Sequence, residues 1–250
     1  MEKIHARQEV YLPQSFPYRM QVKENVRLTG SACEDIVVQL KLGPVSGEEV
    51  RPLKAGQVVR IGIPGVKLPA PGYFSVATSP VEPDGYEFFI KDAGPLSKYL
   101  CDIEAGAELE IEGPMGKGFD IDAYKGFDVY LIGVGMGIAP LRSVWRYILA
   151  NRESYGHVAI YAGFKTSMHC LLTDELERLA EHNIEVSITL ERGPESWDGP
   201  IGYVQQALKN DAPDGHNAVA CLAGMSAMVD ACTETLQNLG FNDSRILLNR

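Results

Sequence analysis

The stretch Leu131-Ile-Gly133-Val-Gly135-Met-Gly137-Ile-Ala-Pro140 decides the fold of the second half of this chain. It contains the end of a short apolar run, residues 129–132, which is typical of a buried strand, and it leads into a segment with helical periodicity that extends to Ala150. Glycine lets the backbone approach a ligand closely, and the free N–H groups of a helix N-terminus attract phosphate. The stretch therefore predicts a strand–turn–helix unit that binds a phosphorylated ligand. Tight packing between the strand and the helix is the alternative explanation of the glycines.

The pattern beyond this turn alternates between strands and helices. We expect strands over 157–161, 185–190 and 217–222, and helices over 140–150, 172–181, 201–209 and 227–239. Strands that alternate with helices form parallel sheets, because each helix crosses back over the sheet. The sequence therefore predicts an α/β nucleotide-binding domain over residues 123–250.

The first half has a different pattern, with short β-rich runs separated by glycine and proline. We expect strands over 26–28, 36–42, 57–63, 72–78, 86–91 and 108–112, with one short helix over 96–103. Glycine and proline interrupt the pattern at 43–44, 65, 69–72, 83–85 and 113–114. Six short strands at this spacing predict a small antiparallel β-barrel over residues 1–122.

Composition excludes several classes of function. The chain has 250 residues, of which 45% are hydrophobic and 22% charged, and its formal net charge is −10. An acidic protein is a poor general ligand of nucleic acid, because phosphate needs a basic surface. Residues 1–20 contain no signal-peptide pattern, and no segment reaches the roughly 20 apolar residues that span a membrane. We therefore expect a cytoplasmic protein without a membrane span.

The cysteines and histidines do not form a metal-binding or catalytic pattern. Five cysteines is an odd number, and no two of them have the C-x-x-C spacing of a zinc or iron–sulfur site. We therefore expect the cysteines to be small buried residues in a reducing compartment. The histidines have no ligand or triad spacing, so we expect surface or capping residues and no metal site. They are His5, His157, His169, His182 and His216.

The glycine-rich stretch differs from the Rossmann pattern G-x-G-x-x-G, because its glycines occupy every second position and Ile-Ala-Pro follows. In this form, with Leu141-Arg-Ser143 after it, it resembles the nicotinamide-domain motif of the ferredoxin–NADP reductase family. Four further segments match that family in the same order. They are Pro71-Gly-Tyr-Phe74-Ser75-Val-Ala77-Thr78, Ile90-Lys91 with Gly94-Pro-Leu-Ser97, Glu112-Gly-Pro-Met-Gly116-Lys-Gly-Phe119, and Ala223-Gly-Met225 with Met228. Trp197-Asp-Gly-Pro-Ile-Gly202, and Asn151-Arg152 before Tyr155-Gly156, are similar to the branch that contains hydrogenase γ-subunits and the electron-transfer subunit of dihydroorotate dehydrogenase.

The resemblance implies a flavin-dependent oxidoreductase. Such an enzyme transfers hydride from NAD(P)H to FAD, or alternatively FMN, and passes electrons to an acceptor protein or a small molecule. The implied catalytic groups are the Phe74 ring and the Ser75 hydroxyl, both beside the flavin. Phe74 could instead be a barrel-core aromatic, and Ser97 a simple helix cap. The implied flavin contacts are Tyr73, Phe74, Ser75, Val76, Ile90, Lys91, Gly94, Leu96 and Ser97.

The resemblance also implies which residues meet the nicotinamide nucleotide. The glycine-rich turn would receive the pyrophosphate, and Gly224 and Met225 would border the nicotinamide. Lys165 either contacts a 2′-phosphate or is an ordinary exposed lysine. The full implied set is Gly133, Gly135, Gly137, Ile138, Ala139, Pro140, Lys165, Ala223, Gly224 and Met225.

The chain departs from the family pattern at four places. Gly72 stands where the flavin motif has an arginine, and Ala223 and Met225 stand where the family has Cys and Pro. The last printed residues, 247–250, contain neither a terminal aromatic nor a cysteine cluster, so we expect no iron–sulfur cluster. Candidates to replace the missing groups are Lys67, Lys91 and Lys98 for the arginine and Cys221 for the thiol. Two alternatives remain open: a subunit of a larger redox complex, and a flavin-free, degenerate nucleotide-binding or regulatory module.

Overall fold

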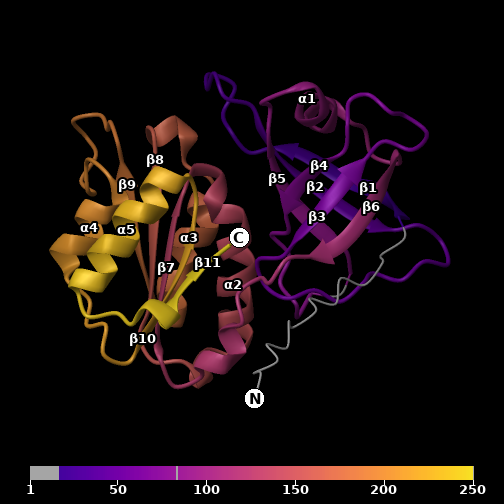
Figure 1. Ribbon diagram of the computed structural model, residues 1–250. Coiled ribbons are helices and arrows are strands. Elements are labelled where there is room, and N and C mark those ends of the chain that lie inside the picture. Colours follow the sequence, from indigo (N-terminus) through magenta and orange to yellow (C-terminus); the bar gives the residue numbers. More distant parts are fainter. Residues whose placement is uncertain (1–16, 83, 250) are drawn as a thin grey trace, which may run out of the picture.

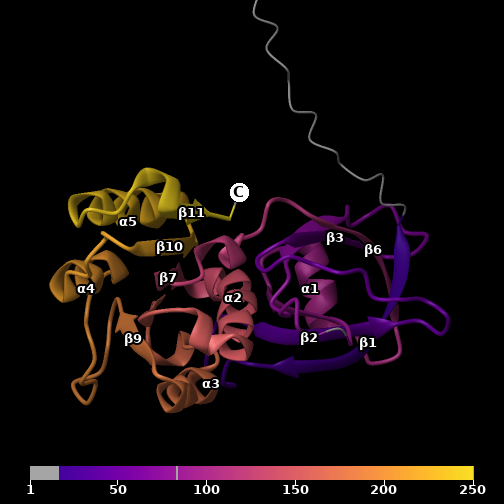
Figure 2. The ribbon, with the colours of Figure 1, turned by 90° about the horizontal axis from the view of Figure 1, so that it is seen from below.

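A computed structural model describes residues 17–82 and 84–249, which form two sheets that lie side by side (Figure 1). The first sheet has six strands in the order β4-β3-β6-β1-β2-β5, and every pair is antiparallel. Its elements are β1 (Tyr18–Arg27), β2 (Val37–Pro44), β3 (Val58–Gly62), β4 (Gly72–Ser75), β5 (Tyr86–Lys91), α1 (Pro95–Asp102) and β6 (Glu108–Met115). The helix α1 lies at one end of the barrel (Figures 1 and 2).

Alternation of buried and exposed side chains explains the barrel. In β1, Tyr18, Met20 and Val22 are buried while their neighbours face solvent, as expected for a strand with one face on a core. The two edge strands approach each other after β4, where the Ala77 amide donates to the Glu87 carbonyl at 2.8 Å. This bond brings the chain from β3 across to β5, so β4 ends at Ser75, three residues before the end of the predicted strand.

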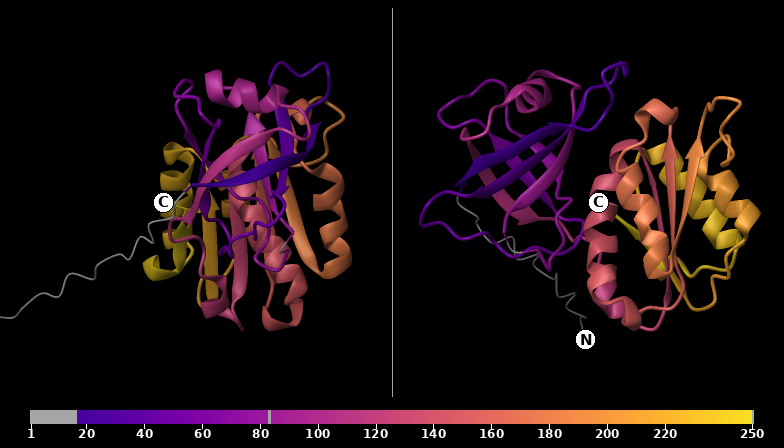
Figure 3. Two further views of the ribbon diagram at one scale, coloured as in Figure 1. Left: turned by 90° about the vertical axis from the view of Figure 1, so that its right-hand side faces the viewer. Right: turned by 180° about the vertical axis from the view of Figure 1, so that it is seen from behind.

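The second sheet has five parallel strands in the order β11-β10-β7-β8-β9. The helices α2 and α3 cover the face toward the barrel, and α4 and α5 cover the opposite face (Figures 1 and 3). The elements are β7 (Asp128–Val134), α2 (Ile138–Ala150), β8 (Val158–Phe164), α3 (Thr173–Arg178), β9 (Ile184–Leu190), α4 (Val204–Asp211), β10 (Ala218–Ala223), α5 (Ser226–Asn238) and β11 (Ile246–Leu248). Single turns of 3₁₀ helix are η1 (Ile121–Tyr124), η2 (Gly135–Gly137), η3 (Arg152–Ser154), η4 (Ser167–His169), η5 (Leu179–His182) and η6 (Asp243–Arg245).

The core of the parallel sheet continues into the barrel. On β7, Val129 and Leu131 pack with α2, while Tyr130 and Ile132 pack with α4 and α5. The cluster on the α2 side also contains buried side chains of the barrel half. They are Val37, Ala55, Ala77, Phe89 and Phe119. A continuous apolar contact therefore joins the two halves of the molecule.

The predicted fold class, an antiparallel barrel followed by a parallel α/β sheet, is confirmed. The last barrel strand ends at Met115 and the first parallel strand begins at Asp128, with the predicted boundary between residues 122 and 123 inside η1. The division into 1–122 and 123–250 remains a prediction. Residues 1–16, which include His5, and residue 250 lie outside the described residues.

Several predicted element bounds were wrong, each for a local reason. β1 begins eight residues earlier than predicted, at Tyr18, because polar residues alternate with apolar ones there. β6 does not end at the Gly113-Pro114 break. The register with β3 shifts there, so that both residues lie in a bulge and the strand continues to Met115. The short strand β11 was not predicted.

Candidate active site

A cleft of about 1020 Å³ lies between the two sheets. The strand order of the parallel sheet reverses between β7 and β10, and ligands of open α/β sheets bind at such a point, beyond the carboxyl ends of the strands. The residues that follow these two strands line the cleft, together with Ser75 of β4 and Lys91 of β5. From the nucleotide set predicted by sequence, the cleft gathers Gly135, Gly137, Pro140, Lys165, Ala223, Gly224 and Met225.

The three glycines of the turn have different roles. A Cβ at Gly133 would lie 2.6 Å from Leu141 Cδ1, and one at Gly137 would collide with the Ala223 carbonyl, so both glycines allow close packing. Gly135 has φ +51° and would have nothing within 4 Å of its Cβ. Its backbone therefore faces open space in the cleft, where a ligand can come near. Gly133 itself lies outside the cleft lining.

Two helix N-termini border the cleft. The helix α2 begins at Ile138, so Pro140 lies in its first turn as predicted, and α5 begins at Ser226 directly after Met225. Residues of both first turns line the cleft. The N-terminus of a helix carries partial positive charge and free N–H groups, so two of them favour an anion such as a pyrophosphate. Ile138 and Ala139, in the same first turn of α2, are buried in the core and do not line the cleft.

On the barrel side, Ser75 reaches the cleft and Phe74 does not. The Ser75 hydroxyl accepts a hydrogen bond from Asn249 Nδ2 at 3.5 Å, which brings the segment after β11 to the flavin motif. Phe74 is half-buried and packs against the barrel core, whereas Tyr73 is 66% exposed. Val76 and Ile90 are buried in the barrel. Part of the Phe74 side chain therefore packs in the barrel core, as the alternative interpretation expected, while its contact with flavin remains a prediction.

The predicted flavin-phosphate segment lies outside the cleft lining, at the start of α1. Ser97 Oγ donates to the Gly94 carbonyl at 3.1 Å and accepts from the Ala93 amide at 2.9 Å, which is a local capping arrangement. Leu96 is buried in the barrel core. A Cβ at Gly94 would meet nothing within 4 Å, so the first turn of α1 is open to a ligand.

Gly72, at the position of the missing arginine, lies against this same turn. A Cβ there would lie 3.0 Å from Leu96 Cδ2 and 3.4 Å from Phe74 Cε2, so a side chain at this position would press against Leu96 of α1 and against Phe74. Of the candidate replacements, Lys91 Nζ is held by Asp35 at 2.6 Å and Lys98 Nζ lies 3.6 Å from Asp102. Lys98 belongs to α1, is 65% exposed, and also lies 4.0 Å from Asp92.

Acidic residues of the barrel half cross the cleft to basic residues of the α/β half. Lys165 Nζ lies 2.8 Å from Glu34 Oε1, and this hydrogen bond lowers the pKa of Glu34 and raises that of Lys165. The hydrogen bond from Lys91 lowers the pKa of the neighbouring Asp35. Lys165, for which both a 2′-phosphate contact and an ordinary exposed position were open, is therefore already paired with a carboxylate.

The expectation that every histidine is a surface or capping residue was wrong for His169. Its side chain is only 13% exposed and lines the cleft. Nδ1 lies 2.7 Å from Thr166 Oγ1, and Nε2 lies 3.5 Å from Asp35 Oδ2, across the cleft. The fold around η4 turns this ring inward, and no sequence spacing indicated that. The other described histidines are exposed.

Cys221 does not replace the missing thiol. It lies two residues before Ala223 on β10 and faces the same side of the sheet, but it is fully buried in the core and burial raises the pKa of its thiol. Of the other cysteines, Cys33 and Cys232 are buried and Cys101 and Cys170 are half-buried. Within residues 17–82 and 84–249, no three His, Cys, Asp or Glu side chains group as metal ligands. In the same part of the chain, no helix has the length and apolar character needed to cross a membrane.

Comparisons with known proteins agree with this geometry. Residues 131–234 match the family described as "Oxidoreductase NAD-binding domain". The chain is 26% identical over 245 residues to the sulfhydrogenase 1 subunit gamma of Pyrococcus furiosus, a match covering 96% of this chain and 82% of the relative. Two solved structures share the fold with a TM-score of 0.78 each, and each match covers 93% of this chain and 97% of the other. They are the cytochrome b5 reductase domain of Ulva prolifera nitrate reductase, 20% identical, and a ferredoxin NADP+ reductase from Neisseria gonorrhoeae, 18% identical.

These similarities support the ferredoxin–NADP reductase superfamily. The resemblance found in the sequence motifs is thus confirmed. Relative to the pattern of that superfamily, the protein keeps the glycine-rich turn at the sheet reversal and departs at Gly72, Ala223 and Met225.

Sequence reasoning missed three polar residues that line the cleft, Asp35, His169 and Asn249, and Glu34, which pairs with the lining residue Lys165. Glu34, Asp35, His169 and Asn249 come from loops or from the segment after an unpredicted strand. Their placement depends on how the two halves meet, which no local motif encodes. The adjacent acidic pair at residues 34–35, just before a predicted strand, was the only sequence signal that could have drawn attention to them.

Proposed function

We propose that this protein is an NAD(P)H-dependent flavoprotein reductase that takes hydride from the dinucleotide and passes electrons to an acceptor. The observation that carries the proposal is the convergence of Gly135, Gly224 and Ser75 on one cleft, although Ser75 and Gly224 are 149 positions apart in the sequence. The ferredoxin NADP+ reductase from Neisseria gonorrhoeae, which has the same fold, was solved with bound FAD and NADP.

The residues of the cleft suit a dinucleotide. The N-termini of α2 and α5 would bind its pyrophosphate, and the open backbone at Gly135 leaves room for it. Met225, which is 70% exposed, would cover the nicotinamide end. The remaining predicted residues, Gly133, Ile138 and Ala139, would support this surface from beneath.

The residues of the barrel edge suit a flavin in part. Ser75 would orient the ring with its hydroxyl, and Tyr73 and Phe74 offer aromatic surfaces beside it. The open first turn of α1, with Gly94 and Ser97, would receive the flavin phosphate. A bound flavin supplies the hydride and electron chemistry, while the protein fixes both rings and excludes water. We favour FAD, with FMN as the alternative.

The proposal extends to the protein's partner and to its location in the cell. The similarity to a sulfhydrogenase subunit gamma supports a role as the electron-transfer subunit of a redox complex. Cytoplasmic location, predicted from the composition, belongs to this proposal as well.

The test is the visible absorption spectrum of the freshly purified protein, repeated without oxygen after addition of NADH or NADPH. We expect flavin bands that bleach with at least one nucleotide. A second function is supported by Gly72, because the barrel lacks an arginine at the position where the resemblance implies one. A colourless protein that binds neither FAD nor FMN, but still binds a dinucleotide, would establish this flavin-free regulatory module instead.

A further inference from the structure

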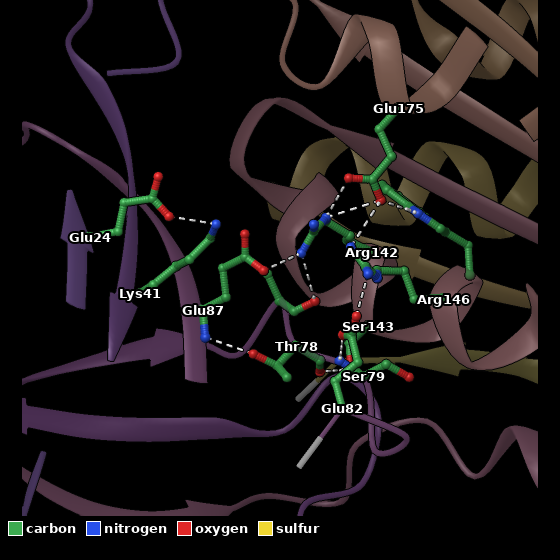
Figure 4. Close-up of polar contacts among 12 residues, drawn as sticks. Glu24, Lys41, Thr78, Ser79, Glu82, Glu87, Arg142, Ser143, Arg146 and Glu175 are labelled. Carbon is green, nitrogen blue, oxygen red and sulfur yellow. Dashed lines mark hydrogen bonds and ion pairs between the residues drawn. The ribbon is translucent and has the colours of Figure 1, made fainter. Parts of the chain in front are cut away.

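A buried arginine joins the two halves of the molecule. Arg142 lies on α2, five residues after Gly137, and its side chain is only 4% exposed. Nη1 donates to Glu87 Oε2 of β5 at 2.7 Å, and Nε donates to both carboxylate oxygens of Glu175 of α3 at 2.9 and 3.1 Å. Figure 4 shows the guanidinium between these two carboxylates, one from each half. Trp145 Nε1 donates to Glu175 at 2.9 Å and fixes its position.

The same turn of α2 also holds the backbone that follows the flavin motif. Ser143 Oγ donates to the Thr78 carbonyl at 2.5 Å, and Arg142 Nη1 lies 3.5 Å from the Ala77 carbonyl. Thr78 Oγ1 in turn accepts from the Glu87 amide at 2.6 Å. The carbonyls of Ala77 and Thr78 are thus fixed by α2, two and three residues after Ser75.

These contacts form a short rigid path between the two predicted binding segments. The helix α2 opens at the glycine-rich turn, and its second turn is bonded to the chain that leaves Ser75. A buried guanidinium that bonds to two carboxylates has few alternative geometries, because each lost bond would leave a charge without a partner in the interior. The spacing between Gly135 and Ser75 is therefore set by Arg142 and Ser143.

We propose that Arg142 and Ser143 are positioning residues, which set the separation and angle between the dinucleotide and the flavin without contacting either. The inference rests on the proposed reductase function. Displacement of a reacting group by about 1 Å can lower a rate by roughly a hundredfold. The bonds of Arg142 and Ser143 to the barrel half are called the clamp below. Loss of the clamp should therefore lower the rate of hydride transfer far more than the affinity for either cofactor.

The helix offers a matched control. Arg146 lies one turn further along α2 and also bridges the two halves through Glu82, but its side chain is 35% exposed. No bond joins it to the Ala77 or Thr78 carbonyls among the described residues. Arg146 Nη1 also lies 3.9 Å from Glu175 Oε1, so a change at Arg146 removes a bridging charge and one long contact with that carboxylate. Every hydrogen bond of Arg142 and Ser143 stays in place.

The experiment compares Arg142→Met, Arg142→Lys and Arg146→Met with the wild-type holoprotein. We would measure flavin content, the dissociation constant for NADH and NADPH, the limiting rate of flavin bleaching by stopped flow, and hydrogen exchange of the whole chain. For Arg142→Met we expect a rate at least tenfold lower, with affinities and flavin content within twofold of wild type. Exchange should rise in the peptides that cover residues 76–88. Arg142→Lys should recover part of the rate, and Arg146→Met should match wild type.

Two results would overturn the clamp: an unchanged rate in Arg142→Met, or a loss of affinity as large as the loss of rate. If Arg142→Met does not fold, Ser143→Ala removes a single hydrogen bond and should lower the rate about threefold with the same unchanged affinities; a wild-type rate there would equally overturn it. If neither nucleotide reduces the wild-type flavin, the reductase function fails. Hydrogen exchange in residues 76–88 would still show whether Arg142 holds that segment in place.

Discussion

Asparagine at position 135 would separate ligand binding by the glycine-rich turn from its packing. Gly135 has φ +51°, a conformation that Asn adopts more readily than other side chains, and its Cβ would meet no atom within 4 Å. The free energy of unfolding should therefore fall by no more than about 1 kcal/mol. By contrast, alanine at Gly137 would collide with the Ala223 carbonyl and should lower it by roughly 3 kcal/mol.

Dinucleotide affinity should change much more than stability in Gly135→Asn. The new side chain of Gly135→Asn would extend into the cleft, where the backbone is expected to meet the pyrophosphate. Loss of a charge-assisted hydrogen bond is worth about 1.5–3 kcal/mol, which corresponds to a 10- to 100-fold weaker dinucleotide affinity. Urea unfolding would give the stability, and calorimetric titration with NADH and NADPH would give the affinity.

Gly65 provides the control for this experiment. It has φ +70°, its Cβ would also meet nothing within 4 Å, and it does not line the cleft. Gly65→Asn should thus reproduce the small change in stability and leave dinucleotide affinity at the wild-type value. Wild-type affinity in folded Gly135→Asn would refute the reasoning, because the turn would then not approach the ligand.

Three further changes give distinct outcomes. Ser75→Ala should slow flavin bleaching in stopped flow without lowering the unfolding midpoint, and an unchanged rate would remove Ser75 from the mechanism. Glu34→Gln should release Lys165 and strengthen NADPH binding relative to NADH; a constant ratio of dissociation constants would show that Lys165 does not meet the 2′-phosphate. Asp35 has a lowered pKa in the folded protein, so its charge stabilises the fold above the unfolded pKa, and this contribution is lost as pH falls. The difference in unfolding free energy between wild type and Asp35→Asn should therefore shrink below about pH 4, and a difference independent of pH would contradict it.

Periodicity was sufficient to predict the fold class, because both halves follow simple rules. The run at residues 86–91 became β5 with the same bounds, and the predicted helix ending at Ala150 ends there in α2. The prediction failed where tertiary contacts override local pattern. The strand of the Gly72 segment ends early because Ala77 bonds across to Glu87, and β11 exists because it pairs with β10.

The candidate site was predictable only as far as motifs encode it. The glycine-rich turn and the Ala223–Met225 segment come together because each follows one of the two strands at which the strand order reverses. Ligands of open α/β sheets bind at this point, so the site can be predicted from the sequence once the strand order is known. Asp35 and His169 meet in the cleft only because the barrel docks against α2 and α3, which depends on dispersed apolar residues. Arg142 was noticed as part of a motif, but its partners Glu87 and Glu175 lie 55 residues before it and 33 after it.

The apolar cluster that runs from α2 into the barrel bears on how the protein melts. Ala77, Phe89 and Phe119 are buried against side chains of the α/β half, and separation of the halves would expose them to water. We therefore expect each half to lose stability without the other, and heat to unfold the chain in one cooperative transition in place of two. Two fragments produced by a cut near Lys125 would each expose apolar surface, and we expect them to aggregate unless they are co-expressed.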